Sequence, residues 1–267
     1  MINKTHIYAY PLYYEIGFCN SPIQKEVKFI IESYKKYNHN SPPSSILDNG
    51  CGTGIYLEKL AKLGLRVSGY DSSLQMVKYA AFRLKKVTKE SQIFRANLKN
   101  FRIKDKFDMA IALNGSFQYL ISIKDILSHF ESVSRVLKLG GLYLISFPSP
   151  QDFVDNPPGF IKSQWSHKRG KITVAVNWTY QQHPICRESQ TFSGQAKIKV
   201  KDNRNIFNLQ MPYRYRIFSL KELEFLVKIS RNLEIVDIYG DFSLNKVFMK
   251  MQKPKCMNAI LRKINNA

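Results

Sequence analysis

The sequence lacks long apolar runs and has no apolar signal core near its first residue. Its longest apolar stretches, such as Met109–Leu113 and Leu142–Phe147, are far shorter than the roughly 20 residues that span a bilayer as a helix. The opening stretch MINKTHIYAYPLYY has no apolar core followed by a small-residue cleavage site. We therefore expect no membrane contact and a cytoplasmic location.

Cysteine and histidine are also scarce and scattered. The 4 cysteines form no CxxC pair, which predicts free thiols in a reducing compartment. The 5 histidines are equally dispersed, so the sequence predicts no metal site.

Acidic residues are few beside basic ones. The chain has 20 Asp and Glu against 41 Lys and Arg, a net charge of +21. Residues 1–148 carry 21 basic against 11 acidic side chains, and residues 149–267 carry 20 against 9, so no basic tail is present. We interpret this charge as a solvated surface and keep nucleic acid as an alternative partner.

Short apolar runs alternate with amphipathic segments between residues 44 and 147. Strands that alternate with helices form a parallel sheet covered on both faces, so the pattern predicts an α/β fold. The expected strands are residues 45–48, 66–71, 91–96, 107–113 and 140–147, and the expected helices are residues 21–37, 55–63, 73–87 and 123–138.

The alternation stops at Pro148. Antiparallel strands are expected at residues 171–182, 193–202 and 206–218, followed by a helix over 219–230 and a strand pair, 233–240 and 242–252, that closes the sheet edge. We divide the chain into an N-terminal cap segment and helix (1–43), a core (44–147 and 217–253), a lid insert (148–216) and a C-terminal tail (254–267).

The stretch DNGCGTG, residues 48–54, places three glycines between a predicted strand and a predicted helix. It does not fit the dinucleotide pattern G-x-G-x-x-G, because Ile55 stands where the third glycine is needed, and it is not a P-loop. Asp48 and Asp71 each end a predicted strand. A carboxylate at the second strand's tip can accept both hydroxyls of a ribose. An acid beside the glycine turn suits an ammonium group, so the expected ligand is a nucleoside that carries an amino acid.

Five stretches, in this order, resemble class I S-adenosylmethionine-dependent methyltransferases of the small-molecule type. They are ILDNGCGTG, VSGYDSSLQMVKYA, FRANLKNF, FDMAIALNGSFQYL and SRVLKLGGLYLIS. The resemblance covers about residues 44–147. It implies a Rossmann-like, seven-stranded, mostly parallel sheet with helices on both faces, to which the insert adds an antiparallel β lid. It also implies S-adenosyl-L-methionine as the cofactor and a transferase activity.

The resemblance also implies which residues bind the cofactor. The glycine loop lets the backbone approach the methionine part and the adenosine, Asp71 holds the ribose hydroxyls, the pair after the third strand flanks the adenine, and the pair after the fourth lines the methionine side. The family often has Asp where Asn97 stands, and the Asn carbonyl can accept the same hydrogen bond with modest weakening. The expected cofactor-binding residues are Asp48, Gly50, Cys51, Gly52, Asp71, Asn97, Leu98, Leu113 and Asn114.

The leader and the insert supply candidates for the acceptor side. Methyl transfer from a sulfonium needs a base only when the acceptor must first lose a proton, and no such residue stands out. His183, Tyr14 and Tyr180 are the candidates for that base. The aromatic and basic insert predicts a pocket for a small acceptor, anionic ones included, with Trp165, Tyr180 and Arg214 as acceptor-binding residues.

We therefore expect a methyltransferase that acts on N or O of a small-molecule acceptor. An RNA methyltransferase that uses the basic surface and a non-catalytic relative that only binds the cofactor are the alternatives. The sequence predicts neither the acceptor's identity nor the oligomeric state.

Overall fold

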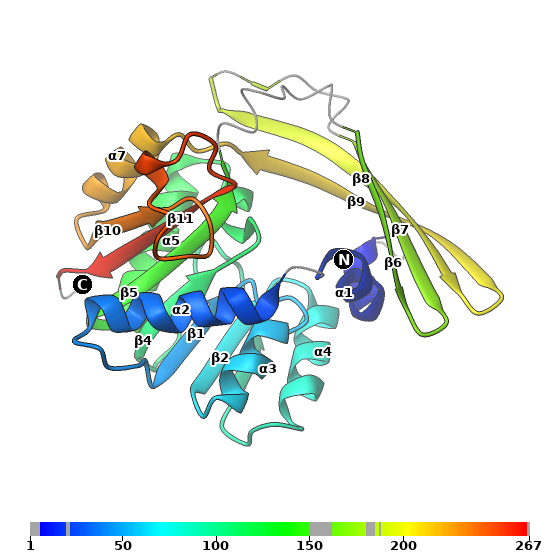
Figure 1. Cartoon of the computed structure of the whole chain (residues 1–267), viewed down its shortest axis with the longest axis horizontal. Coiled ribbons are helices and arrows are strands. Elements are labelled where there is room, and N and C mark those ends of the chain that lie inside the picture. Colours follow the sequence, from blue (N-terminus) through cyan, green and yellow to red (C-terminus); the bar gives the residue numbers. More distant parts are fainter. Residues whose placement is uncertain (1–5, 20–21, 150–161, 180–184, 187, 266–267) are drawn as a thin grey trace.

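The computed structural model describes residues 6–19, 22–149, 162–179, 185–186 and 188–265. Seven strands form one large sheet, in the order β10-β11-β5-β4-β1-β2-β3 (Figure 1). Every pair from β5 to β3 is parallel, and β11 alone runs against its neighbours. The strands are β1 (Ser45–Asn49), β2 (Arg66–Asp71), β3 (Gln92–Arg95), β4 (Phe107–Ala112), β5 (Leu137–Pro148), β10 (Leu233–Tyr239) and β11 (Cys256–Lys263). The predicted α/β fold is confirmed.

Helices cover both faces of this sheet, as Figure 1 shows. Successive residues of a strand point to opposite faces, and the core divides accordingly. Ile46 packs with α2 and α3, whereas its neighbour Leu47 packs with α5 and α7. None of the described helices is long and apolar enough to cross a membrane. The longer helices are α2 (Ile23–Tyr37), α3 (Ile55–Lys62), α4 (Leu74–Leu84), α5 (Ile123–Val136) and α7 (Leu220–Ser230).

A second, antiparallel sheet of four strands stands beside the large one (Figure 1). Its strands are β6 (Lys162–Arg169), β7 (Ile172–Thr179), β8 (Thr191–Asp202) and β9 (Asn205–Arg216). The antiparallel insert is thus confirmed, although β6 was not predicted from the sequence.

One face of the small sheet packs on the N-terminal segment. There η1 (Ile7–Ala9) and α1 (Pro11–Phe18) share a buried apolar cluster with β7, β8 and β9. Ile16 and Val174 are both buried in that cluster. A Cβ at Gly17 would lie 2.9 Å from Val174 Cγ1, so α1 approaches the sheet closely. The N-terminal segment therefore lies between the unit built on the large sheet and the small sheet, and it belongs to both.

The expected strand over residues 242–252 is wrong, and so is the assignment of residues 254–267 to a tail. Residues 256–263 form β11, which lies between β10 and β5. Met257 and Ile260 are fully buried in the cores on opposite faces, as an inner strand requires. The apolar residues of 242–252 are half-buried by loop packing instead, apart from the exposed Met249: the Phe242 ring lies 5.6 Å from that of Phe29, and η3 (Phe248–Lys250) follows. The other segment boundaries stay predictions.

Candidate active site

The glycine loop joins β1 to α3 at the carboxyl end of the large sheet. The backbone N–H groups of Gly50 and Cys51 both donate to the Tyr70 carbonyl, at 3.0 and 2.9 Å. Gly52 has a φ of +52°, which disfavours other residues, and a Cβ there would meet no atom within 4 Å. The loop is thus held against β2 and leaves open space beside Gly52.

Two carboxylates flank this loop at neighbouring strand ends. Asp71 accepts hydrogen bonds from the N–H groups of Gly52, at 3.0 Å, and Ser73, at 2.8 Å. Burial raises the pKa of Asp71, and these N–H groups oppose the rise. Burial, with the nearby charge of Asp71, raises the pKa of Asp48 to about 8. Among the described residues, no donor or cation pairs with the Asp48 carboxylate, so its partner must come from a ligand or from protonation.

All nine residues expected to bind the cofactor line one pocket of about 440 Å³. The parallel strands explain this convergence, because their carboxyl ends meet at one edge of the sheet. Thr53 also lines the pocket, and its buried Oγ1 has no hydrogen-bond partner among the described residues. A buried hydroxyl without a partner is unfavourable, and a polar ligand in the pocket would satisfy it.

The part of the pocket that carries Asn97 and Leu98, where adenine is expected, is supported by a residue that the sequence did not indicate. His129 is fully buried, and burial lowers its pKa to about 4. A carbonyl can only accept, so His129 Nδ1–H donates to the Leu98 carbonyl at 2.7 Å, and Nε2 accepts from the Tyr143 hydroxyl at 2.6 Å. The imidazole therefore anchors the loop that carries Asn97 and Leu98.

Six aromatic side chains and Met211 line another part of the pocket. We call this set the aromatic side: Tyr8, Tyr14, Phe18, Tyr119, Trp178, Met211 and Tyr215. They come from the N-terminal segment, from η2 (Ser116–Tyr119) and from the small sheet, so segments far apart in the sequence meet here. The small sheet thus closes the pocket opposite the glycine loop.

Three phenols on the aromatic side form a hydrogen-bonded group. Tyr215 donates to the Tyr119 hydroxyl at 3.0 Å, and the Tyr8 and Tyr119 hydroxyls lie 2.9 Å apart. Burial raises the pKa of all three hydroxyls, so they are uncharged near neutral pH. Tyr119 follows β4 closely, so a search for polar residues after each predicted strand would have found it. Tyr215 could be found only once the fold of the insert was known.

The residues expected on the acceptor side have mixed outcomes. Tyr14 lines the pocket, but burial raises its pKa well above 10, which disfavours a role as base. Trp165 does not line it; its Nε1–H donates to the Gly17 carbonyl at 2.6 Å and fastens α1 to the sheet. Arg214 does not line it either, because alternation along β9 turns it to the other face from Tyr215. Tyr180 and His183 lie outside the described residues.

Few charges line the pocket. Besides the two carboxylates there is Lys99, whose Nζ already pairs with Asp125 at 2.8 Å. Within the described ranges, no arginine lines the pocket and no group of metal-ligating side chains is found. The lining therefore gives no support to an anionic acceptor.

Comparisons with known proteins agree with this geometry. A family model described as a methyltransferase domain matches residues 46–141. A putative methyltransferase of Geobacillus sp. (strain WCH70) is 26% identical over 141 residues, 53% of this chain and 57% of that protein. The dTDP-3-amino-3,4,6-trideoxy-alpha-D-glucopyranose N,N-dimethyltransferase of Streptomyces venezuelae is 26% identical over 135 residues, 50% of this chain and 54% of that enzyme. The chain thus spans little more than half the length of these two relatives.

A solved structure extends the likeness in fold to nearly the whole chain. The S-adenosylmethionine-dependent methyltransferase from Clostridium acetobutylicum ATCC 824 superposes with a TM-score of 0.77 at 19% identity, over 95% of this chain and 97% of that one. The ordered motifs, the single reversed strand of the sheet and the match to a methyltransferase domain over residues 46–141 make this chain similar to class I S-adenosylmethionine-dependent methyltransferases, and the solved structure extends that likeness in fold.

Proposed function

We propose that the protein transfers a methyl group from S-adenosylmethionine to an N or O atom of a small molecule bound on the aromatic side of the pocket. The observation that carries this proposal is one pocket with two unlike sides. The glycine loop and two carboxylates form one side, and uncharged aromatic residues form the other. A cofactor and a small acceptor would then share a single enclosed space.

The residues present fit the cofactor. The unpaired Asp48 carboxylate suits the ammonium group of the methionine part, and Asp71 suits the ribose hydroxyls. The unpartnered hydroxyl of Thr53 gives the pocket a further polar contact. When bound, this cofactor supplies a sulfonium methyl group that is already activated for displacement.

The chain itself would align the acceptor and exclude water. An in-line displacement depends mainly on holding the acceptor atom close and on the correct axis. The aromatic side chains supply shape and a dry surface, and the hydroxyls of Tyr8, Tyr119 and Tyr215 supply uncharged hydrogen-bonding groups. A neutral amine already carries the lone pair that attacks, so such a site methylates it without a base.

The charge of the pocket lining and the similarity to a known enzyme favour an amine over an acid as the acceptor. Among the described lining residues, the charged side chains without an ion-pair partner are the carboxylates of Asp48 and Asp71, which attract a cationic or neutral molecule. The Streptomyces venezuelae relative is named for methylating the amino group of a nucleotide-linked sugar. We therefore propose an amino group on a small hydroxylated molecule as the acceptor. The cytoplasmic location stays a prediction.

The test combines binding with transfer. Titration calorimetry with S-adenosylhomocysteine should show micromolar binding, and NAD should not bind. Methyl-labelled cofactor is then incubated with panels of amino sugars, small amines, phenols and bulk RNA. Label in an amine or hydroxyl compound supports the proposal. Label in RNA alone would identify an RNA methyltransferase, and binding without any transfer would identify a non-catalytic relative.

A further inference from the structure

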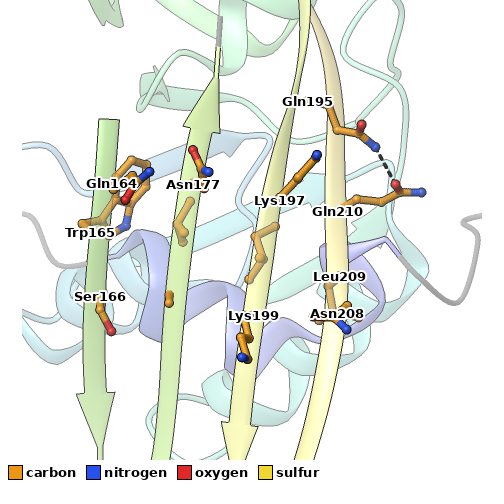
Figure 2. Close-up of a pocket in the computed structure, with 13 residues that line it drawn as sticks. Gln164, Trp165, Ser166, Asn177, Gln195, Lys197, Lys199, Asn208, Leu209 and Gln210 are labelled. Carbon is orange, nitrogen blue, oxygen red and sulfur yellow. Dashed lines mark hydrogen bonds between the residues drawn. The ribbon is translucent and has the colours of Figure 1, made fainter. Parts of the chain in front are cut away.

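The small sheet has a second face, which is turned away from α1 and from the pocket. The register of the four strands places on it the alternate residues that do not contact the N-terminal segment. We call it the polar face. Figure 2 shows Gln164, Asn177, Lys197, Lys199 and Asn208 on its four strands. These residues line a hollow of about 780 Å³.

The polar face carries charge of one sign. Five of its side chains are cationic and exposed: Lys168, Lys197, Lys199, Lys201 and Arg214. The register places no Asp or Glu on this face within the described parts of β6 to β9, and none of the five cations forms an ion pair with a described residue. Such a cluster repels itself and attracts polyanions.

The one acidic residue of β8 lies on the opposite face. Asp202 accepts a hydrogen bond from the Tyr13 hydroxyl at 2.9 Å, and this bond connects α1 to the small sheet. The strand KIKVKD thus separates its charges by face: three lysines at alternate positions point one way, about 7 Å apart along the strand.

We propose that the polar face binds nucleic acid through its phosphates, without reading the base sequence. Lysine and arginine side chains neutralise phosphates, and amides and hydroxyls donate to their oxygens. The aromatic residues that could stack on bases, such as Trp178 and Tyr213, lie on the opposite face in the cluster with α1. Contacts on this face are therefore limited to the backbone of the ligand.

Charge and composition disfavour the other occupants. Specific protein interfaces have an apolar or aromatic centre. Among the described residues of β6 to β9, the apolar side chains on the polar face are Ala175, Pro212 and Ile206, and the one large side chain of these, Ile206, is exposed at the hairpin end rather than at a centre. A second copy of this chain would set lysines against lysines. The face is also the back of the sheet that closes the pocket, so nucleic acid bound there does not reach the cofactor side. Binding is thus separate from methyl transfer.

The test uses two charge-reversal variants of the full chain with equal net charge. Lys197→Glu/Lys199→Glu/Lys201→Glu changes the polar face, and Lys85→Glu/Lys86→Glu/Lys89→Glu changes exposed lysines at the end of α4. Anisotropy of a short labelled DNA duplex is measured between about 50 and 200 mM salt. We expect the first variant to bind at least tenfold more weakly, with the salt slope reduced by roughly 2 to 3. The α4 variant should change binding less than threefold.

Two outcomes would overturn the proposal: equal weakening in both variants, which reports net charge alone, or no binding by the wild type at the lower salt. Melting temperature and S-adenosylhomocysteine affinity are measured on both variants and should match the wild type. If the charge-reversal variant of the polar face melts early, it is replaced by the neutral variant Lys197→Gln/Lys199→Gln/Lys201→Gln. Wild-type affinity of this neutral variant for the duplex would also overturn the proposal.

Discussion

The backbone N–H of Gly52 donates a 3.0 Å hydrogen bond to Oδ2 of Asp71. One carboxylate oxygen thus fixes the glycine loop while the other accepts from the Ser73 N–H at the start of α4. The residue expected to hold the ribose therefore also connects the end of β2 to the glycine loop and to the start of α4. Removing it must affect ligand binding and local order together.

Asp71→Ala should bind S-adenosylhomocysteine about 10- to 150-fold more weakly, roughly 1.5–3 kcal/mol, because the ribose hydroxyls lose their acceptor. It should also melt earlier, since two buried N–H groups lose theirs. Asp71→Asn keeps one acceptor oxygen and should melt closer to the wild type while still binding weakly. Calorimetry and thermal melting check both variants. Wild-type affinity in Asp71→Ala would show that this carboxylate does not hold the cofactor.

Asp48 predicts a pH dependence with opposite signs for binding and stability. Its pKa is about 8 in the folded protein and 3.8 ordinarily, so the folded state binds the extra proton between these values. The stability from this proton is complete below about pH 4 and is lost as pH rises to about 8, so the free protein should melt earlier at higher pH. Cofactor affinity should instead rise over that range, because an ammonium group favours the carboxylate.

Asp48→Asn tests that assignment. The variant cannot ionise, so it should melt later than the wild type near pH 8, by roughly 2–4 °C for each kcal/mol gained. Its cofactor affinity should be lower and nearly independent of pH. A parallel pH dependence in the variant and the wild type would assign the titration to another group.

Tyr119→Phe should lower kcat and leave S-adenosylhomocysteine affinity within about threefold of the wild type. The substitution removes the hydroxyl that joins Tyr8 to Tyr215, which lie on the aromatic side of the pocket, where we propose that the acceptor binds. Tyr10→Phe is the matched control, because Tyr10 does not line the pocket. Steady-state kinetics with an identified acceptor, together with calorimetry, separate the two effects. An equal loss of cofactor affinity would move this phenol group to the cofactor side.

Trp165→Ala and Arg214→Ala should differ in stability. Trp165 packs on Phe18 and Trp178 and donates to Gly17, so its loss should cost about 3–5 kcal/mol and lower the melting temperature. Arg214 is exposed on the polar face, so its loss should stay within about 0.5 kcal/mol with turnover unchanged. A turnover defect in Arg214→Ala at normal stability would return this residue to the acceptor site.

The sequence predicted which residues line the pocket near the glycine loop better than it predicted those on the aromatic side, for a physical reason. Asp48 and Asp71 lie at the carboxyl ends of adjacent parallel strands, and such ends meet at one edge of the sheet whatever the rest of the fold. Trp165 and Arg214 depend on strand parity, and a shift of one residue turns a side chain to the other face. Tyr119 and Tyr215 form a hydrogen bond, and so do His129 and Leu98. Each bond joins segments that are far apart in the sequence, so no local sequence pattern could predict it.

The position of strand β11 also determines the order in which the last strands of the large sheet can pair during synthesis. It is hydrogen-bonded to both β5 and β10, so β10 has no place in the large sheet until residues 256–263 have left the ribosome. Until then β5 presents an unpaired and strongly apolar edge, which is the kind of surface that pairs with another chain. Nascent chains that end between β5 and β11 therefore carry an exposed sheet edge that can pair with another chain.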